Sequence, residues 1–270
     1  MIVPIDDAQL LTDRTHLTHV QYRTDANLAA RQSVYAYQVP KIDLAAAVLD
    51  LARLDGTETV AEIGCGNGIY LAELTRRRHG GRVLGADLSR GMLTAARTGA
   101  PGAGLVVGDA AGLPLGDEVA DVTLAAHMLY HVPDGPAAAR EFRRITRTGG
   151  QLLVVLNDAD HLRELRELVE AVGVSFGREP GATWAQFEAM TVDRGAELLA
   201  ELFSVVERHD LAGELLIPGP QPVIDYVAST WTAQSLPDPE AFTAAVTERV
   251  QFGPDGMFRV RTRSGVLICR

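Results

Sequence analysis

The chain has 270 residues, of which 47% are hydrophobic and 22% are charged, and these fractions are ordinary for a globular protein. This length suits one large domain or a core with a smaller element, and the composition excludes a disordered chain, a collagen and a coiled-coil rod. With 25 Lys and Arg against 35 Asp and Glu, the formal charge of −10 disfavours non-specific nucleic-acid binding.

The N-terminal region shows no charged-then-apolar targeting pattern, and no apolar run in the chain approaches the ~20 residues that span a bilayer. Two cysteines, Cys65 and Cys269, are too few for a disulfide framework. We therefore expect a cytoplasmic protein without a membrane partner. The apolar spacing predicts helices over residues 26–38 and 41–54, and the first must end before Pro40.

From residue 57 onward, short apolar runs alternate with helical patterns. This alternation is typical of a parallel sheet covered by helices on both faces, so it predicts an α/β, doubly wound, Rossmann-like architecture. The expected strands are 59–63, 82–86, 104–107, 119–125 and 151–156, and the expected helices are 70–79, 89–98 and 136–146.

Beyond residue 156 the alternation stops. Helical patterns cover 161–172, 183–190, 194–202, 222–231 and 239–250. Thr183 with Gln186 resembles a capping box, and Asp238 before Pro239 is a favourable helix start. The stretches 203–216 and 258–269 alternate polar and apolar residues, which predicts two antiparallel strands.

The strongest functional signal is the segment VAEIGCGNG at residues 60–68. An apolar strand ends beside Glu62, glycines follow at every second position, and a helix begins at Ile69. Such glycines allow a sharp turn and let a ligand approach the main chain, although a tight turn without a ligand is the alternative. Their spacing differs from the dinucleotide fingerprint, which disfavours an NAD-dependent enzyme.

Two further acids follow the next two expected strands. Asp87 can accept hydrogen bonds from both hydroxyls of a ribose, or it is only a residue favoured at a helix N-terminus. Asp109 can accept from an exocyclic adenine amine while the backbone of Ala110 meets a ring nitrogen; a solvated turn is the alternative. The three acids would meet at one edge of the sheet.

The ordered segments EIGCGNG, GADLS, GDAAGLPL, DVTLAAHMLYHVPD and GGQLLVVL resemble the class I S-adenosylmethionine-dependent methyltransferases, in particular the bacterial group that acts on small molecules. The resemblance covers about residues 57–156. It implies a seven-stranded sheet whose last two strands are antiparallel to the rest. It divides the chain into a helical lid (1–54), a cofactor-binding core (55–157), a substrate-cap insertion (158–202) and C-terminal core strands (203–270) with a helical insertion (219–252).

The resemblance also implies S-adenosylmethionine as the cofactor. Glu62 matches the acid at the methionine end, where aspartate is commoner in the family, and Asp87 matches the ribose acid. The other implied cofactor contacts come from Gly64, Gly66, Gly68, Leu88, Asp109, Ala110 and Ala125.

The segments around Tyr22 and Arg31 resemble the helical lid of related enzymes. Arg31 would neutralise the cofactor carboxylate and Tyr22 would cover its methyl end. A surface arginine and a packing tyrosine are the alternatives to these roles.

His127 and His131, in AHMLYHVP, follow the fourth expected strand and are candidate general bases. A base matters only if the acceptor must lose a proton, and the rate would then rise with pH through about 6–7. His131 can equally be a structural hydrogen-bonder, so we favour His127, and Asp158 is a third possibility. The remaining histidines have no convincing ligand spacing, so we expect no metal site.

The function that follows is transfer of a methyl group to an O, N or C atom of a small molecule, in specialised metabolism. A protein that keeps the cofactor and catalyses a cyclisation or elimination is the alternative. We expect no nucleic-acid partner and a monomer or homodimer. The identity of the acceptor is not encoded in any motif.

Overall fold

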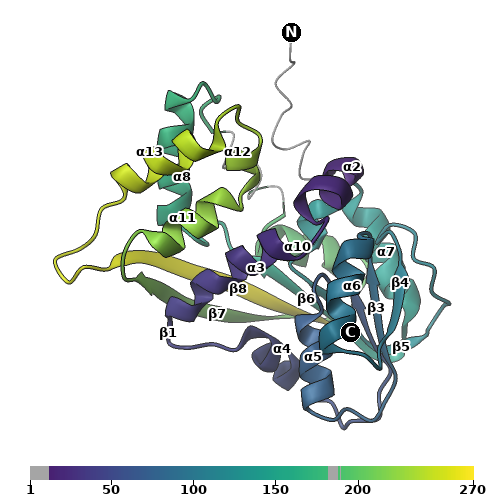
Figure 1. Cartoon of the computed structure of the whole chain (residues 1–270). Helices are drawn as coiled ribbons and strands as arrows, with labels where there is room; N and C mark the ends of the chain where they lie inside the picture. The colour runs from purple at the N-terminus through teal and green to yellow at the C-terminus, as the bar shows by residue number, and fades with distance from the viewer. Residues whose placement is uncertain (1–11, 182–187, 189) are drawn as a thin grey trace.

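The computed structural model describes residues 12–181, 188 and 190–270 (Figure 1). The described residues form one sheet in the order β1-β7-β8-β6-β5-β2-β3-β4. This arrangement, with helices on both faces, confirms the predicted α/β, doubly wound, Rossmann-like architecture. The strands are β1 Gln38–Val39, β2 Val60–Ile63, β3 Val83–Asp87, β4 Gly104–Val107, β5 Ala120–Ala126, β6 Thr146–Asn157, β7 Val206–Ile217 and β8 Phe258–Cys269.

The parallel half of the sheet follows from the buried apolar runs. β2 lies between β3 and β5, with Val60 paired to Val83 on one side and to Val122 on the other. All four residues of β2 are buried, including the carboxyl group of Glu62. Because parallel strands end at the same edge, the motif residues that follow β2, β3, β4 and β5 are brought together there.

The C-terminal half of the sheet differs in two details from the predicted one. β8 is antiparallel to β6 and to β7, so β7 runs in the direction of β6, and of the two C-terminal strands only β8 is reversed. The two-residue strand β1 pairs with β7, Gln38 opposite Leu215, and adds an eighth strand. A strand of two residues leaves no periodicity in a sequence, which is why the helix predicted over 26–38 included Gln38, the first residue of β1.

Helices cover both faces of the sheet, and the alternating side chains of β6 show how. Leu153 and Val155 pack with α4 and α5 on one face. Leu152, Val154 and Leu156 pack with α7 and α10 on the other. These core helices are α4 Leu44–Ala52, α5 Ile69–Arg76, α6 Arg90–Gly99, α7 Gly135–Ile145 and α10 Val192–Ala200.

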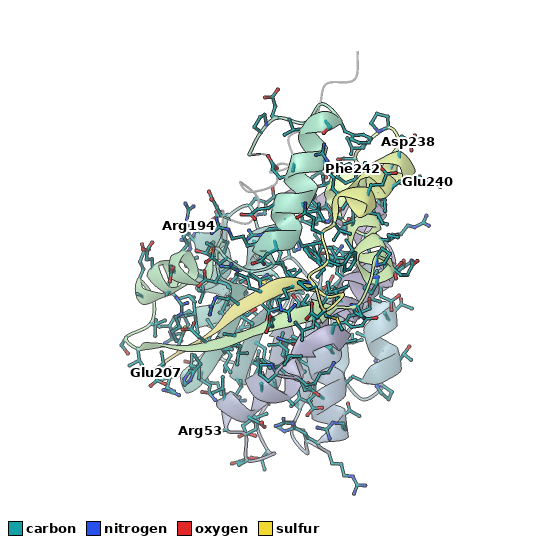
Figure 2. All side chains as sticks on the ribbon, turned by 90° about the vertical axis from the view of Figure 1, so that its left-hand side faces the viewer. Arg53, Arg194, Glu207, Asp238, Glu240 and Phe242 are labelled. Atoms are coloured by element: carbon teal, nitrogen blue, oxygen red, sulfur yellow. The ribbon has the colours of Figure 1, made fainter. Side chains whose placement is uncertain are left out.

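The remaining long helices form a cap at one end of the sheet (Figure 1). Phe242, on α13 and labelled in Figure 2, is fully buried in the cap in one cluster with apolar residues of α8. α13 begins at the predicted cap, where Asp238 accepts from the Ala241 N–H at 2.9 Å. The cap contains α3 Ala26–Ser33, the 3₁₀ helix Val34–Tyr37, α8 Arg163–Ser175, α11 Gln221–Ala228, α12 Trp231–Gln234 and α13 Pro239–Arg249.

The segment expected to be a single substrate cap, 158–202, contributes to two places. Its helix α8 packs in the cap, whereas α10 returns to the sheet and packs against β6 and β8. The helix predicted to start at Thr183 and Gln186 lies outside the described residues. No helix among those described is long and apolar enough to cross a membrane.

Gly265 tests how tightly α10 is seated on the sheet. A Cβ on Gly265 would overlap Cγ2 of Val192 and lie 3.2 Å from its Cβ, and Val192 is fully buried at the start of α10. Gly265→Ala should therefore lower the free energy of unfolding by about 1–3 kcal/mol through overpacking. Chemical denaturation measures it. Gly102→Ala is the control, because its Cβ meets nothing within 4 Å; equal losses in both variants would contradict the packing argument.

Candidate functional site

Two cavities meet at the carboxyl edge of the parallel strands. The smaller, which we call the crevice, has a volume of about 200 Å³ and lies against the glycine loop and the ends of β2, β3 and β5. The larger, which we call the chamber, has a volume of about 700 Å³ and lies between the sheet and the cap. The residues that line both cavities form a shared wall: Tyr22, Leu28, Arg31, Gln32, Ile69, His127, Tyr130 and His131.

The glycine loop adopts a backbone that side chains disfavour, since φ is 67° at Gly64, 53° at Gly66 and 79° at Gly68. A Cβ on Gly64 would lie 2.6 Å from the Met128 side chain, and one on Gly68 would lie 2.8 Å from Cβ of Ala96. Gly64 and Gly66 line the crevice, whereas Gly68 caps α5 behind it. A Cβ on Gly66 would lie 3.4 Å from Cδ2 of Leu28 and closer to no other atom, so this glycine leaves the crevice open.

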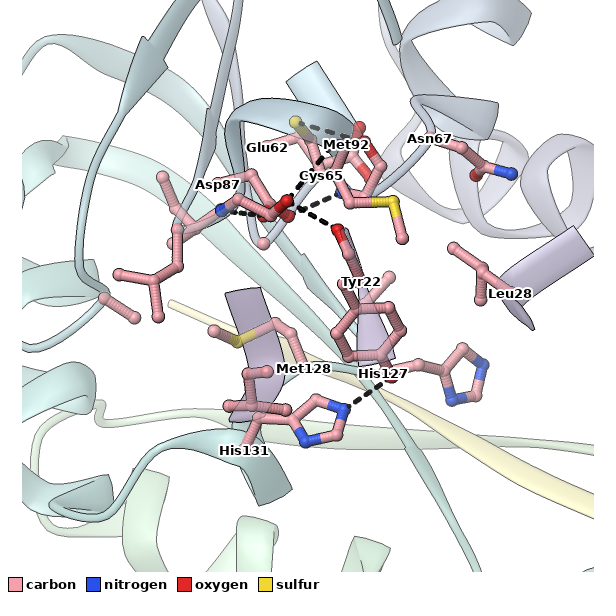
Figure 3. Close-up of a pocket in the computed structure, with 18 of the residues that line it drawn as sticks. Tyr22, Leu28, Glu62, Cys65, Asn67, Asp87, Met92, His127, Met128 and His131 are labelled. Carbon is pink, nitrogen blue, oxygen red and sulfur yellow. Dashed lines mark hydrogen bonds between the residues drawn. The ribbon is translucent and has the colours of Figure 1, made fainter. Parts of the chain in front are cut away.

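Asp87 ties the end of β3 to the glycine loop (Figure 3). Its carboxylate accepts from the backbone N–H of Gly66 and from that of Ser89, each at 2.8 Å. Burial nevertheless raises its pKa, because the two hydrogen bonds only partly offset the loss of water. A carboxylate can accept about four hydrogen bonds, so Asp87 can still accept hydrogen bonds from the hydroxyl groups of a ligand in the crevice.

Glu62 is 2% exposed, and its Oε2 has no hydrogen-bond partner in the described structure. Burial raises its pKa well above the usual range, and the nearby charge of Asp87 raises it further. A buried carboxyl oxygen without a partner is costly, and a cationic or hydrogen-bond-donating ligand would relieve that cost. This orphaned oxygen fits the positively charged end of the expected cofactor.

The end of the crevice beside Asp109, where adenine is expected, holds a residue that the sequence analysis missed. Arg14, from the helix α2 Arg14–His16, forms an ion pair with Asp109. The carboxylate expected to meet adenine therefore already has a basic partner, 95 positions away in the chain. Leu88 and Ala110 also line the crevice, and their contact with adenine stays a prediction.

Ala125 is the second predicted contact that the structure places away from the crevice. It is fully buried in β5 and does not line the cavity, whereas Ala126, the next residue, does. The resemblance assigned the contact to the main-chain carbonyl of Ala125, and the strand extends one residue further than predicted, to Ala126, which lines the crevice instead.

The N-terminal segment is fastened across the crevice through Tyr22. Its hydroxyl lies 3.0 Å from Nε2 of His131 and accepts from Arg31 at 3.3 Å. Arg31 also donates to the carbonyl of Ser229 at 2.8 Å, and Ser89 donates to the carbonyl of Tyr22 at 2.6 Å. Figure 3 shows Tyr22 between Asp87 and His131. Tyr22 and Arg31 thus lie where the lid was predicted.

His127 lines both cavities at the end of β5, in a left-handed backbone conformation with φ of 53°. The backbone N–H of His127 donates to the carbonyl of Val155 at 2.9 Å, and this bond holds the turn against β6. Burial lowers the pKa of His127 to about 4. The ring is therefore neutral at pH 7, and the titration expected near 6–7 moves to about 4.

The described residues contain no group of three or more His, Cys, Asp or Glu side chains placed to hold a metal ion. Both thiols, those of Cys65 and Cys269, are buried, and burial raises their pKa. The titratable side chains that line the crevice include those of Glu62, Asp87, Asp109, Arg14, Arg31, Tyr22, Tyr130, His127 and His131.

Residues 61–154 match the family model of the methyltransferase domain. A malonyl-[acyl-carrier protein] O-methyltransferase from Serratia marcescens is 32% identical over 130 residues, which cover 48% of this chain and 50% of that protein. A demethylmenaquinone methyltransferase from Mycobacterium bovis is 38% identical over 102 residues, which cover 38% of this chain and 42% of that protein. The matches span half or less of these relatives.

Solved structures share the fold over most of the chain. A protein from Bacillus halodurans described as a methyltransferase has a TM-score of 0.60 and 20% identity, covering 85% of this chain and 99% of that one. The [4+2]-cyclase SpnF has a TM-score of 0.51 and 17% identity, covering 84% and 79%. At such identities these likenesses establish the fold.

Gly66→Val tests whether the crevice binds the cofactor. The valine would adopt a disfavoured backbone conformation and fill the space in front of Leu28. We expect affinity for S-adenosylmethionine, measured by calorimetry, to fall by at least about 2–3 kcal/mol. Gly112→Ala, a glycine outside both cavities whose Cβ meets nothing within 4 Å, should bind as the wild type does. Wild-type affinity in the valine variant would refute this use of the crevice.

Glu62→Gln separates binding from stability. Because the folded pKa of Glu62 lies above its unfolded value, the carboxyl lowers stability as pH rises from the ordinary glutamate range through the folded pKa. The glutamine variant should therefore gain stability relative to the wild type at pH 7.5, and this gain should vanish below about pH 4. Its affinity for S-adenosylmethionine should fall by about 1.5–3 kcal/mol.

Urea denaturation at the two pH values and calorimetry at pH 7.5 measure these effects. A variant that is less stable at pH 7.5 and binds as tightly as the wild type would show that Glu62 is structural.

Proposed function

Because residues 61–154 form a methyltransferase domain of the class I S-adenosylmethionine-dependent family, we propose that the whole chain transfers a methyl group from that cofactor to an O, N or C atom of a small molecule. The observation that carries the proposal is the shared wall. A crevice with a glycine loop, the buried Glu62 and the partly buried Asp87 opens, across Tyr22 and His127, on a chamber large enough for a second molecule.

The residues of the crevice fit the parts of the cofactor. Glu62 would hold the ammonium end, Asp87 the ribose hydroxyls, and Arg31 the carboxylate. Leu88 and Ala110 would flank the adenine, whose amine would compete with Arg14 for Asp109. When bound, S-adenosylmethionine supplies a methyl group on a sulfonium sulfur, which leaves as a neutral thioether.

The residues of the shared wall would orient the acceptor and exclude water. Most of the acceleration in such a displacement comes from positioning, which the wall supplies by enclosing the junction of the two cavities. His127, neutral at pH 7, can accept a proton from an acceptor that must lose one. His131 is held by Tyr22, so we assign it the positioning of the lid.

The chamber supports a small-molecule acceptor. Its volume falls in the usual range for ligand pockets, and aliphatic and aromatic side chains line it together with polar and charged ones. The relatives are named for acting on malonyl-[acyl-carrier protein] and on demethylmenaquinone. A role in specialised metabolism, a cytoplasmic location, a monomer or homodimer and the absence of a nucleic-acid partner belong to the same proposal.

The experiment that tests the function uses S-adenosylmethionine labelled on its methyl group. The purified chain is incubated with fractions of small-molecule extract, and the label is followed into a new product. Transfer of label, with one S-adenosylhomocysteine formed per product, supports the proposal. A product formed without label and without S-adenosylhomocysteine would instead support the cofactor-retaining cyclisation or elimination.

The two histidines are distinguished by single-turnover rates measured between pH 4 and 9 with the acceptor so identified. If the acceptor loses a proton, His127→Ala should lower the rate by about 10²–10⁴-fold and leave cofactor affinity intact. The wild-type rate should be flat above about pH 5, because the pKa of His127 is about 4. His131→Ala should lower the single-turnover rate by a smaller factor. A larger loss in His131→Ala, or a wild-type rate that rises through pH 6–7, would contradict the assignment.

A further inference from the structure

The middle of β8, where β6 ends beside it, carries a contact at the wall of the chamber. β6 pairs with β8 only as far as Asn157 opposite Ser264, and the following residues take over the edge of β8. Asp158 donates its N–H to the carbonyl of Arg263 at 3.1 Å. The N–H of Arg263 in turn donates to Nδ1 of His161 at 3.0 Å. A backbone edge therefore fixes the position of this buried imidazole.

This bond also fixes the tautomer of His161. A backbone N–H can only donate, so Nδ1 carries no proton. Burial lowers the pKa of His161 to about 3, assisted by His127 and Arg166, so the ring is neutral. A neutral imidazole has one N–H, which must then be on Nε2. Nε2 lies 2.8 Å from the hydroxyl of Tyr35 and donates to its oxygen.

The hydroxyl of Tyr35 is thereby left as a donor. Its oxygen accepts from His161, and His161 is the one hydrogen-bond partner that the described part of the chain offers this hydroxyl. Tyr35 and His161 both line the chamber, beside His127. Burial raises the pKa of Tyr35, with Tyr226 and Tyr130 adding to the effect, so the hydroxyl keeps its proton throughout the physiological range.

We propose that Tyr35, backed by His161, is an oxygen-recognition site for the acceptor, and that the acceptor is an apolar molecule with a carbonyl oxygen. A carbonyl oxygen only accepts hydrogen bonds, so it matches a hydroxyl whose oxygen is already engaged. The aliphatic part of the chamber lining, which includes Leu165 and Val169, would bury the apolar part. The inference rests on the proposed function in one respect: it takes the chamber as the acceptor site.

Binding of a matched pair of probes tests the site without methyl transfer. 2-Acetylnaphthalene and 2-ethylnaphthalene have similar shapes and differ in one carbonyl oxygen. Their affinities for the chain are measured by calorimetry, with quenching of Trp231, which lines the chamber, as a second signal. We expect the wild type to bind the ketone about 3- to 10-fold more tightly than the hydrocarbon, the range for one neutral hydrogen bond.

Tyr35→Phe should reduce this ratio to about one while leaving affinity for the hydrocarbon unchanged. Tyr37→Phe is the matched control, since Tyr37 lies on the same 3₁₀ helix, lines neither cavity and should keep the wild-type ratio. Equal affinities in the wild type, no measurable binding of the ketone, or a ratio that survives in Tyr35→Phe would overturn the proposal.

The positioning role of His161 has its own readout. Nitrogen-15 spectra of the imidazole should show the neutral Nε2–H tautomer from pH 5 to 8, and a protonated or Nδ1–H ring would overturn the argument. In His161→Asn the amide oxygen can still accept from the N–H of Arg263, but the side chain cannot reach Tyr35. The ratio of ketone to hydrocarbon affinity should therefore lie between that of the wild type and that of Tyr35→Phe. Failure of the wild type to bind S-adenosylmethionine would refute the proposed function and leave this ratio unaffected.

Discussion

Two carboxyl groups, that of buried Glu62 and that of partly buried Asp87, lie beside one another where β2 and β3 end, and the rest of the site depends on them. The register of the parallel sheet brings them together, because Glu62 pairs with Gly85 and Asp87 follows two residues later on the neighbouring strand. Burial raises the pKa of both. Such an arrangement lowers the stability of the free chain and is relieved by a cationic ligand, which is the usual compromise at a functional site.

The surrounding structure encloses these acids from three directions. The glycine loop passes beside them because Gly66 donates its N–H to Asp87. The N-terminal segment closes over them because Tyr22 is tied to Ser89 on one side and to His131 on the other. The cap then places the chamber on the far side of Tyr22, so a donor and an acceptor would meet at one enclosed junction.

Features set by local pattern were predictable from the sequence. The apolar runs predicted the bounds of β2 to β5 within one residue at either end. The polar–apolar alternation of residues 258–269 predicted the observed bounds of β8, and the spaced glycines predicted the loop after β2. β6 begins at Thr146, five residues earlier than predicted, because Gly149 and Gly150 interrupt the apolar pattern from which the start of the strand was predicted. The site residues that the sequence missed are paired over long separations: Arg14 with Asp109 across 95 positions and Tyr35 with His161 across 126. The lowered pKa of His127 depends on burial by distant elements, which no local motif encodes.

The protons exchanged when S-adenosylmethionine binds test the central claim most directly. Calorimetry at pH 5.5 in buffers of different ionisation enthalpy counts them. A cationic ligand lowers the raised pKa of the buried carboxyls, so the account predicts that protons are released on binding by the wild type and that fewer are released by Glu62→Gln. Proton uptake, or a release that is the same in both proteins, would contradict the claim that Glu62 and Asp87 form a site for a cationic cofactor.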